Sequence, residues 1–272
     1  MAAERLPGTS AAEQLSPAFP ERAAWGTAGK LRAWQAEALD LYFRDQPKDF
    51  LAVATPGAGK TTFALRLAAE LLAQRVVNRV TVVAPTEHLK VQWADSAARV
   101  GIKLDPHFKN SQGKHAPGYH GVALTYAQVA AKPTLHHNRT AAGRTLVILD
   151  EVHHAGDALS WGDAVREAFG PAVRRLSLTG TPFRSDTSPI PFVTYAPDAE
   201  GIRTSVADYS YGYGRALKDS VVRPVLFLAY AGAMSWRTKA GDEMSHVLGE
   251  ETTKDINSQA WRTALDPAGD WI

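Results

Sequence analysis

A glycine-containing loop between an apolar run and a helical run constrains the fold of this chain more than any other segment. The apolar run covers residues 50–54, and the loop Thr55-Pro-Gly-Ala-Gly-Lys-Thr61 follows it directly. From Thr61 to Arg75 apolar residues recur at helical spacing. Glycines in such a loop let backbone N–H groups approach an anion, and the positive end of the following helix points at the same anion. The segment therefore predicts a strand–loop–helix unit that binds phosphate.

The residues of this loop have separate expected tasks. Gly57 and Gly59 allow the sharp turn. Lys60 would supply charge for the β- and γ-phosphates, and the Thr61 hydroxyl would ligate Mg²⁺. The strict pattern has glycine where this chain has Ala54, so the loop alone leaves an ordinary glycine-rich turn open as the alternative. The candidate nucleotide-binding residues of the loop are Thr55, Pro56, Gly57, Ala58, Gly59, Lys60, Thr61 and Thr62.

Two carboxylates follow a second apolar run. Residues 144–149 are almost continuously apolar, which is typical of a buried central strand in a parallel sheet. Asp150 and Glu151 come next, at the strand end where ligands bind in open α/β sheets. Asp150 is expected to hold Mg²⁺ through water, and Glu151 to act as general base on the attacking water. The acidic pair alone is also compatible with a solvated strand end.

Two histidines follow the carboxylates. His153 is a candidate sensor of the γ-phosphate, with a purely local hydrogen bond as the alternative. For His154 a structural role is the better interpretation.

The chain carries six segments in a characteristic order. They are Leu31-Arg-Ala-Trp-Gln35, Ala54–Thr62, Val82–Trp93, Leu124–Gln128, Asp150–His153 and Leu178–Arg184. In this order they resemble the motifs of the first motor domain of superfamily 2 helicases and translocases, in the DExH group. The Gln-Trp ending of the third segment and the sixth segment look most similar to restriction-enzyme-type and repair-type DNA helicases. They look less like RNA DEAD-box proteins.

The resemblance implies roles for further residues. Gln35 would read the adenine base, and Arg32 would stack on it. Contacts with the phosphates of a nucleic-acid strand are implied for Pro85, Thr86, Thr125 and Tyr126. Coupling between the γ-phosphate and that strand is implied for Thr179, Gly180 and Thr181.

Packing is the alternative for several of these side chains. A buried tryptophan at the position of Trp93 is usually a core residue, and Tyr126 fits packing as well as a nucleic-acid contact. Thr179 and Thr181 also fit a Gly-Thr-Pro turn that closes a strand. Tyrosines at 209, 211 and 213 could stack on bases, but packing at the domain edge is the better interpretation.

Apolar patterning gives the expected fold. Strands are predicted at 50–54, 80–84, 121–125, 145–150, 174–179 and 224–230, and helices at 31–45, 61–75, 87–99 and 158–168. This alternation predicts an α/β fold with a parallel central sheet flanked by helices. The resemblance implies that this fold is a RecA-like P-loop NTPase domain. Loops are predicted at 105–120, 131–144 and 184–200. The expected organisation is a flexible tail (1–30), an ATP-binding domain (31–222), and a linker with the start of an incomplete second domain (223–272).

Composition excludes several classes of function. The chain has no cysteine, so it has no disulfide or thiolate–metal site. No apolar run reaches the ~20 residues that span a bilayer, and the first 30 residues contain no apolar block typical of a secretory signal. We therefore expect a cytoplasmic protein without a membrane partner. A net charge of +2 is only a weak indication of nucleic-acid binding, but it does not exclude local contacts with phosphates.

The resemblance implies an ATP-dependent nucleic-acid motor that uses ATP and Mg²⁺ and acts on DNA more readily than on RNA. Such motors need a second RecA-like domain to supply arginine fingers, so this chain would hydrolyse ATP slowly by itself. Two alternatives stay open. One is a double-strand translocase that does not unwind, and the other is an ATP-binding adaptor that holds nucleic acid or a partner without productive turnover.

Overall fold

A computed structural model of the chain describes residues 31–153, 159–182, 189–198, 201–224, 233–237, 241–247 and 256. The chain divides into two compact units, Met1–Arg223 and Pro224–Ile272. In the second unit the described strands β10 (Ala233–Arg237) and β11 (Glu243–Val247) form an antiparallel hairpin. No helix in the described part of the chain is both long enough and apolar enough to cross a bilayer.

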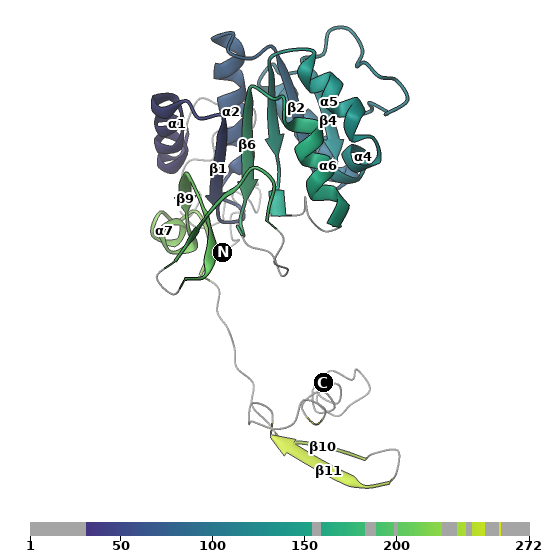
Figure 1. Ribbon diagram of the computed structural model, residues 1–272. Coiled ribbons are helices and arrows are strands. Elements are labelled where there is room, and N and C mark those ends of the chain that lie inside the picture. The colour runs from purple at the N-terminus through teal and green to yellow at the C-terminus, as the bar shows by residue number, and fades with distance from the viewer. Residues whose placement is uncertain are drawn as a thin grey trace, which may run out of the picture. The chain divides into compact units, whose positions relative to one another are not determined.

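A seven-stranded parallel sheet forms the centre of the first unit, in the order β3-β4-β2-β5-β6-β1-β9 (Figure 1). Its strands are β1 (Asp49–Ala54), β2 (Arg79–Ala84), β3 (Leu104–Asp105), β4 (Gly121–Thr125), β5 (Thr145–Leu149), β6 (Arg174–Thr179) and β9 (Tyr209–Tyr211). The helices are α1 (Ala33–Asp45), α2 (Lys60–Ala73), α3 (Glu87–Arg99), α4 (Tyr126–Ala131), α5 (Pro133–Ala141), α6 (Leu159–Phe169) and α7 (Tyr213–Lys218). A separate antiparallel ribbon pairs β7 (Thr194–Pro197) with β8 (Arg203–Val206).

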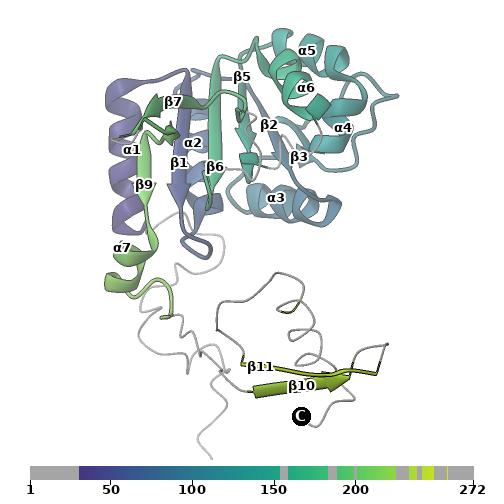
Figure 2. The same ribbon diagram turned by 60° about the horizontal axis from the view of Figure 1, so that its bottom comes forward.

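Helices cover both faces of the sheet. Successive side chains of a strand point to opposite faces, so each strand contributes to both apolar clusters. In β5, Leu146 and Ile148 join the apolar cluster that α1, α2 and α3 cover. Val147 and Leu149 join the cluster that α4 and α6 cover on the other face. Figure 2 shows α4, α5 and α6 gathered together, apart from α1 and α2. Burial on both faces explains why the central strands read as continuous apolar runs.

The predicted α/β fold with a parallel sheet flanked by helices is confirmed. The five predicted strands between residues 50 and 179 and the four predicted helices all occur, with small shifts at their ends. The sixth predicted strand, 224–230, lies outside the described residues apart from its first position, and so does the predicted tail 1–30.

Three expectations about local structure were wrong or incomplete. The predicted loop 184–200 contains strand β7, which pairs with β8. The predicted loop 131–144 contains helix α5, which begins with Pro133 at its first position and buries His136 and Thr140. Because those buried residues are polar, apolar spacing gave no helical signal. Tyr209–Tyr211 is a strand that pairs with β1, where only packing at the domain edge was expected.

Candidate nucleotide-binding site

The phosphate-binding loop lies between β1 and α2, as the sequence predicted. Gly57 and Gly59 have φ angles of +78° and +92°, in the left-handed region that side chains rarely adopt. A Cβ added to Gly59 would lie only 2.8 Å from Nε2 of Gln35. A side chain at this position would therefore strain the backbone and displace the amide of Gln35.

Three side chains at the start of α1 hold the carbonyl groups of this loop. Nη1 of Arg32 donates to the carbonyl oxygens of Gly57 (3.0 Å) and Ala58 (2.6 Å). Nε1 of Trp34 also donates to the Ala58 carbonyl, at 3.1 Å. Nε2 of Gln35 donates to the Gly59 carbonyl at 2.9 Å. C=O and N–H of one trans peptide point in opposite directions. The N–H groups that follow these carbonyls therefore point away from α1.

The two residues expected to contact adenine, Arg32 and Gln35, hold the loop through their side chains. Gln35 is 2% exposed, and its Oε1 also accepts a hydrogen bond from the main-chain N–H of Arg32. Both polar atoms of its amide are thus used in holding the loop and the start of α1. Adenine contacts of Arg32 and Gln35 stay a prediction. Sequence reasoning missed Trp34 as a third residue that holds the loop, although it lies between the other two.

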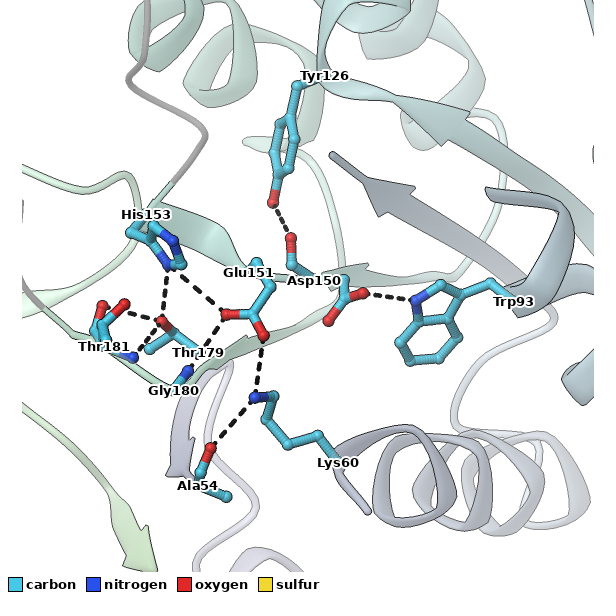
Figure 3. A network of polar contacts seen from close by, with 10 residues as sticks. All are labelled: Ala54, Lys60, Trp93, Tyr126, Asp150, Glu151, His153, Thr179, Gly180 and Thr181. Atoms are coloured by element: carbon cyan, nitrogen blue, oxygen red, sulfur yellow. Dashed lines mark hydrogen bonds and ion pairs between the residues drawn. The ribbon is translucent and has the colours of Figure 1, made fainter. Parts of the chain in front are cut away.

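Lys60 and Glu151 meet at the carboxyl edge of the sheet (Figure 3). Nζ of Lys60 lies 3.0 Å from Oε1 of Glu151 and donates to the carbonyl oxygen of Ala54 at 3.1 Å. The main-chain N–H of Gly180 donates to Oε2 of Glu151 at 3.2 Å. They meet because β1, β6 and β5 are neighbours in the sheet, so the segments that follow them leave at one edge.

Glu151 is held in an unusual backbone conformation. Its φ angle is +45°, in the left-handed region that a non-glycine residue enters at a cost of roughly 1–3 kcal/mol. Such strain persists only where the surroundings fix the residue, and here the contacts with Lys60 and Gly180 do so.

His153 contacts the end of β6. Its Nδ1 lies 2.9 Å from Oγ1 of Thr179 and 3.7 Å from Oε2 of Glu151. The hydroxyl of Thr179 donates to the carbonyl of Thr181 and accepts from the main-chain N–H of the same residue. Because the single hydroxyl proton is used in that way, Nδ1 of His153 carries the proton and donates to Thr179. The segments expected to sense the γ-phosphate and to couple it are thus in direct contact.

Asp150 is 8% exposed and is held by two aromatic side chains (Figure 3). Nε1 of Trp93 donates to its Oδ2 at 2.7 Å, and the hydroxyl of Tyr126 donates to its carbonyl oxygen at 2.9 Å. Burial raises the pKa of the Asp150 carboxyl above its ordinary value, while the hydrogen bond from Trp93 opposes that rise. Thr61, the other expected Mg²⁺ ligand, lies in the first turn of α2, directly after Lys60.

The residues expected to contact nucleic acid differ in their exposure to solvent. Thr86 is exposed at the start of α3, where its side chain caps the helix by accepting from Leu89 N–H. Thr125 caps α4 in the same way but is buried. Tyr126 is fully buried with its hydroxyl on Asp150, so its side chain packs inside the domain and does not reach a nucleic-acid strand. The packing alternative holds for Tyr126, and contacts through Pro85, Thr86 and Thr125 stay a prediction.

Trp93 and the remaining residues of the predicted motifs also have defined positions. Trp93 is buried, as its packing alternative predicted, but it also binds a carboxylate, which sequence reasoning missed. Its position in the third motif was the only available signal. Pro56 and Thr62 are exposed, whereas Thr55 is half-buried and its carbonyl accepts from Ala58 N–H. His154 and the last two residues of the sixth motif, 183–184, lie outside the described residues.

Comparison with known proteins identifies the family. A family model described as "Type III restriction enzyme, res subunit" matches residues 28–184. A protein of Mycobacterium tuberculosis is 63% identical over 242 residues, which cover 89% of this chain and 40% of that protein. A protein of Mycobacterium leprae is 60% identical over 242 residues, covering 89% of this chain and 41% of that protein. Both are named as uncharacterized. The chain thus spans about two fifths of the length of these curated relatives.

Solved structures show the same fold. The type ISP restriction-modification enzyme LlaGI, solved with a DNA substrate mimic, superposes with a TM-score of 0.50 and 15% sequence identity. The match covers 71% of this chain and 21% of that one. The family match covers the phosphate-binding loop, the acidic motif and the strand β6 that closes the site. The order of its motifs resembles that of the first RecA-like domain of superfamily 2 helicases. The chain belongs to the family of the type III restriction enzyme res subunit.

Proposed function

We propose that this chain is the nucleotide-binding half of an ATP-dependent motor that acts on DNA as a helicase or translocase. One observation carries the proposal: the ammonium group of Lys60 and the carboxylate of Glu151 lie 3.0 Å apart. They come from two motifs far apart in the sequence, the phosphate-binding loop and the acidic segment. Phosphate binding and water activation need these two groups side by side.

The residues present fit Mg-ATP. Lys60, the main-chain N–H groups of Gly59 and Lys60, and the amino end of α2 would bind the phosphates. The Thr61 hydroxyl and the Asp150 carboxylate are oxygen groups of the kind that Mg²⁺ prefers. Mg²⁺ held there would supply positive charge against the negative charge that develops on the phosphates.

Glu151 is the proposed general base. Its carboxylate pairs with Lys60 through Oε1 and accepts from Gly180 N–H at Oε2. If Lys60 turns toward a bound phosphate, the carboxylate loses its main counter-charge and can accept a proton from water at Oε1. His153 and Thr179 lie next to this carboxylate and would report its state to the Thr179-Gly-Thr181 segment.

A second RecA-like domain in a longer protein would complete the motor. The mycobacterial relatives are longer than this chain, which leaves room for such a domain in them. Arginine fingers from that domain would be worth on the order of 10³–10⁵ in rate. We therefore expect the chain itself to bind ATP but to hydrolyse it slowly. The preference for DNA over RNA rests on the likeness of motifs to DNA helicases.

Nucleotide binding and hydrolysis by the wild-type chain, Lys60→Ala and Lys114→Ala test this proposal. Lys114 is an exposed loop residue outside the site and serves as the matched control. Each protein is assayed with Mg²⁺ alone and with single-stranded DNA, duplex DNA or RNA. We expect Mg-ATP binding that Lys60→Ala abolishes and Lys114→Ala retains, together with slow turnover.

Other outcomes contradict specific parts of the proposal. Absence of nucleotide binding by the wild type would refute the assignment of this chain as the nucleotide-binding half of a motor. Rapid DNA-stimulated turnover by this chain would refute the need for a second domain. Stimulation by RNA and not by DNA would refute the preferred substrate. Binding without turnover, also in the longer protein, would favour the adaptor alternative.

A further inference from the structure

Trp93 makes an unexpected contact for a residue in the middle of a helix. Its side chain is 3% exposed, and its Nε1 donates to Oδ2 of Asp150 at 2.7 Å, across a sequence separation of 57 residues. Hydrogen bonds to a charged acceptor are shorter and about twice as strong as neutral ones. Filling this part of the core would need only an apolar side chain. The donor group of the indole instead meets the one carboxylate at the end of β5 that is expected to hold Mg²⁺.

Asp150 is also held through its main chain. The hydroxyl of the fully buried Tyr126 donates to its carbonyl oxygen at 2.9 Å. Its own N–H donates to the carbonyl of Val83 at 2.9 Å. With the backbone fixed on both sides, the only freedom left to the carboxylate is its side-chain rotation. The hydrogen bond from Trp93 removes that freedom.

We propose that Trp93 is a positioning residue for the metal site: its indole N–H orients the Asp150 carboxylate for the water shell of Mg²⁺. The inference rests on the proposed function because it concerns the Mg²⁺ of bound nucleotide. Partners that orient a metal-binding carboxylate typically contribute about 10–100-fold to metal affinity or activity. A residue that only fills the core would affect stability and not the dependence of binding on Mg²⁺.

The contact also joins two regions of the domain. Trp93 belongs to α3. The N-cap residue of α3 is the exposed Thr86, a predicted nucleic-acid contact. Asp150 belongs to the nucleotide site. A shift of α3 would therefore move the donor that holds the metal-binding carboxylate, which gives a direct physical route from one region to the other.

Two variants at position 93 separate the hydrogen bond from packing. Trp93→Phe keeps an aromatic ring without a donor. Incorporation of 3-benzothienylalanine at the same position keeps the bicyclic shape and replaces the N–H by sulfur. Trp161→Phe is the matched control, because Trp161 is a half-buried tryptophan on α6, on the other face of the sheet. The affinity of the full chain for a fluorescent ATP analogue is measured in EDTA and across a Mg²⁺ titration.

We expect both position-93 variants to need about tenfold or more Mg²⁺ for half of the gain in nucleotide affinity. Their affinity in EDTA should equal that of the wild type, and Trp161→Phe should match the wild type throughout. An unchanged Mg²⁺ requirement in the benzothienylalanine protein would overturn the inference and leave the proposed function intact. An equal loss with and without Mg²⁺ would also overturn it, because that is the mark of a structural role. A wild type that binds no nucleotide would overturn both.

Discussion

Nζ of Lys60 lies 3.0 Å from Oε1 of Glu151, so the proposed phosphate-binding cation and the proposed general base neutralise each other. A bound phosphate would compete with Glu151 for the lysine, and Oε1 of Glu151 would become accessible to water when the lysine leaves it. We therefore expect the proposed phosphate binding and water activation to be linked through this one ion pair.

Replacement of Glu151 tests this link. Glu151→Gln should bind ATP several-fold more tightly, because Lys60 is released from its carboxylate partner. Hydrolysis should fall by about 10²–10⁴-fold with the loss of the base. The two effects are measured as the dissociation constant and the single-turnover rate, with Glu70→Gln as control, since Glu70 pairs with Arg66 on the outside of α2. Retained hydrolysis in Glu151→Gln would contradict the assignment of the base.

A pair of glycine variants tests the phosphate-binding loop. Gly59 and Gly118 have similar φ angles of +92° and +87°, so alanine strains the backbone at both. Only at Gly59 would the new Cβ collide, at 2.8 Å from Nε2 of Gln35, while Gly118 has open space. We expect Gly59→Ala to lose ATP binding and Gly118→Ala to keep it with a small loss of stability. Equal ATP affinity in the two variants would show that the contact with Gln35 is dispensable.

The buried histidine of α5 predicts a specific dependence of stability on pH. His136 is 1% exposed, and burial, aided by the nearby Arg139 charge, lowers its pKa from 6.5 to about 4. Above pH 6.5 the residue is neutral in both folded and unfolded chains. As pH falls from 6.5 toward 4 only the unfolded chain gains the proton, so the free energy of unfolding decreases, by a total on the order of 3 kcal/mol.

Denaturant titrations at pH 7.5 and pH 5 measure this effect. His136→Asn removes the titrating group and should show a smaller difference between the two pH values than the wild type. His107→Asn, at an exposed position, should behave as the wild type does. The same pH difference in all three proteins would exclude His136 as its source.

The Thr179 hydroxyl is expected to link hydrolysis to movement. Thr179→Val keeps the shape of the side chain but removes the hydroxyl that joins His153 to the Thr181 main chain. In the longer protein we expect ATP hydrolysis to be kept within a fewfold while strand displacement is lost. Thr181→Ala should have the weaker effect, because its contact with Thr179 uses main-chain atoms only. Parallel loss of both activities in Thr179→Val would argue against a coupling role.

Local sequence was sufficient for most of the fold and for the centre of the site. Strands buried on both faces appear as unbroken apolar runs, and amphipathic helices appear through their spacing. The loop at Gly57 and the carboxylates after β5 could be placed because their position follows from the strand that precedes each of them. Helix α5 was not predicted, because it buries the polar residues His136 and Thr140, which give no apolar spacing.

The sequence by itself thus determined where the predicted phosphate-binding loop and the acidic pair lie in the fold, because those positions depend on neighbours in the chain. Only the tertiary structure decided that Trp93 bonds to Asp150, that Tyr126 faces inward, and that Lys60 pairs with Glu151. The first contact joins the segments after the neighbouring strands β2 and β5. The other two reach across one strand, from β4 over β2 to β5 and from β1 over β6 to β5. The periodicity of a segment reports which of its faces is buried, but the partner on that face is set by the order of strands in the sheet.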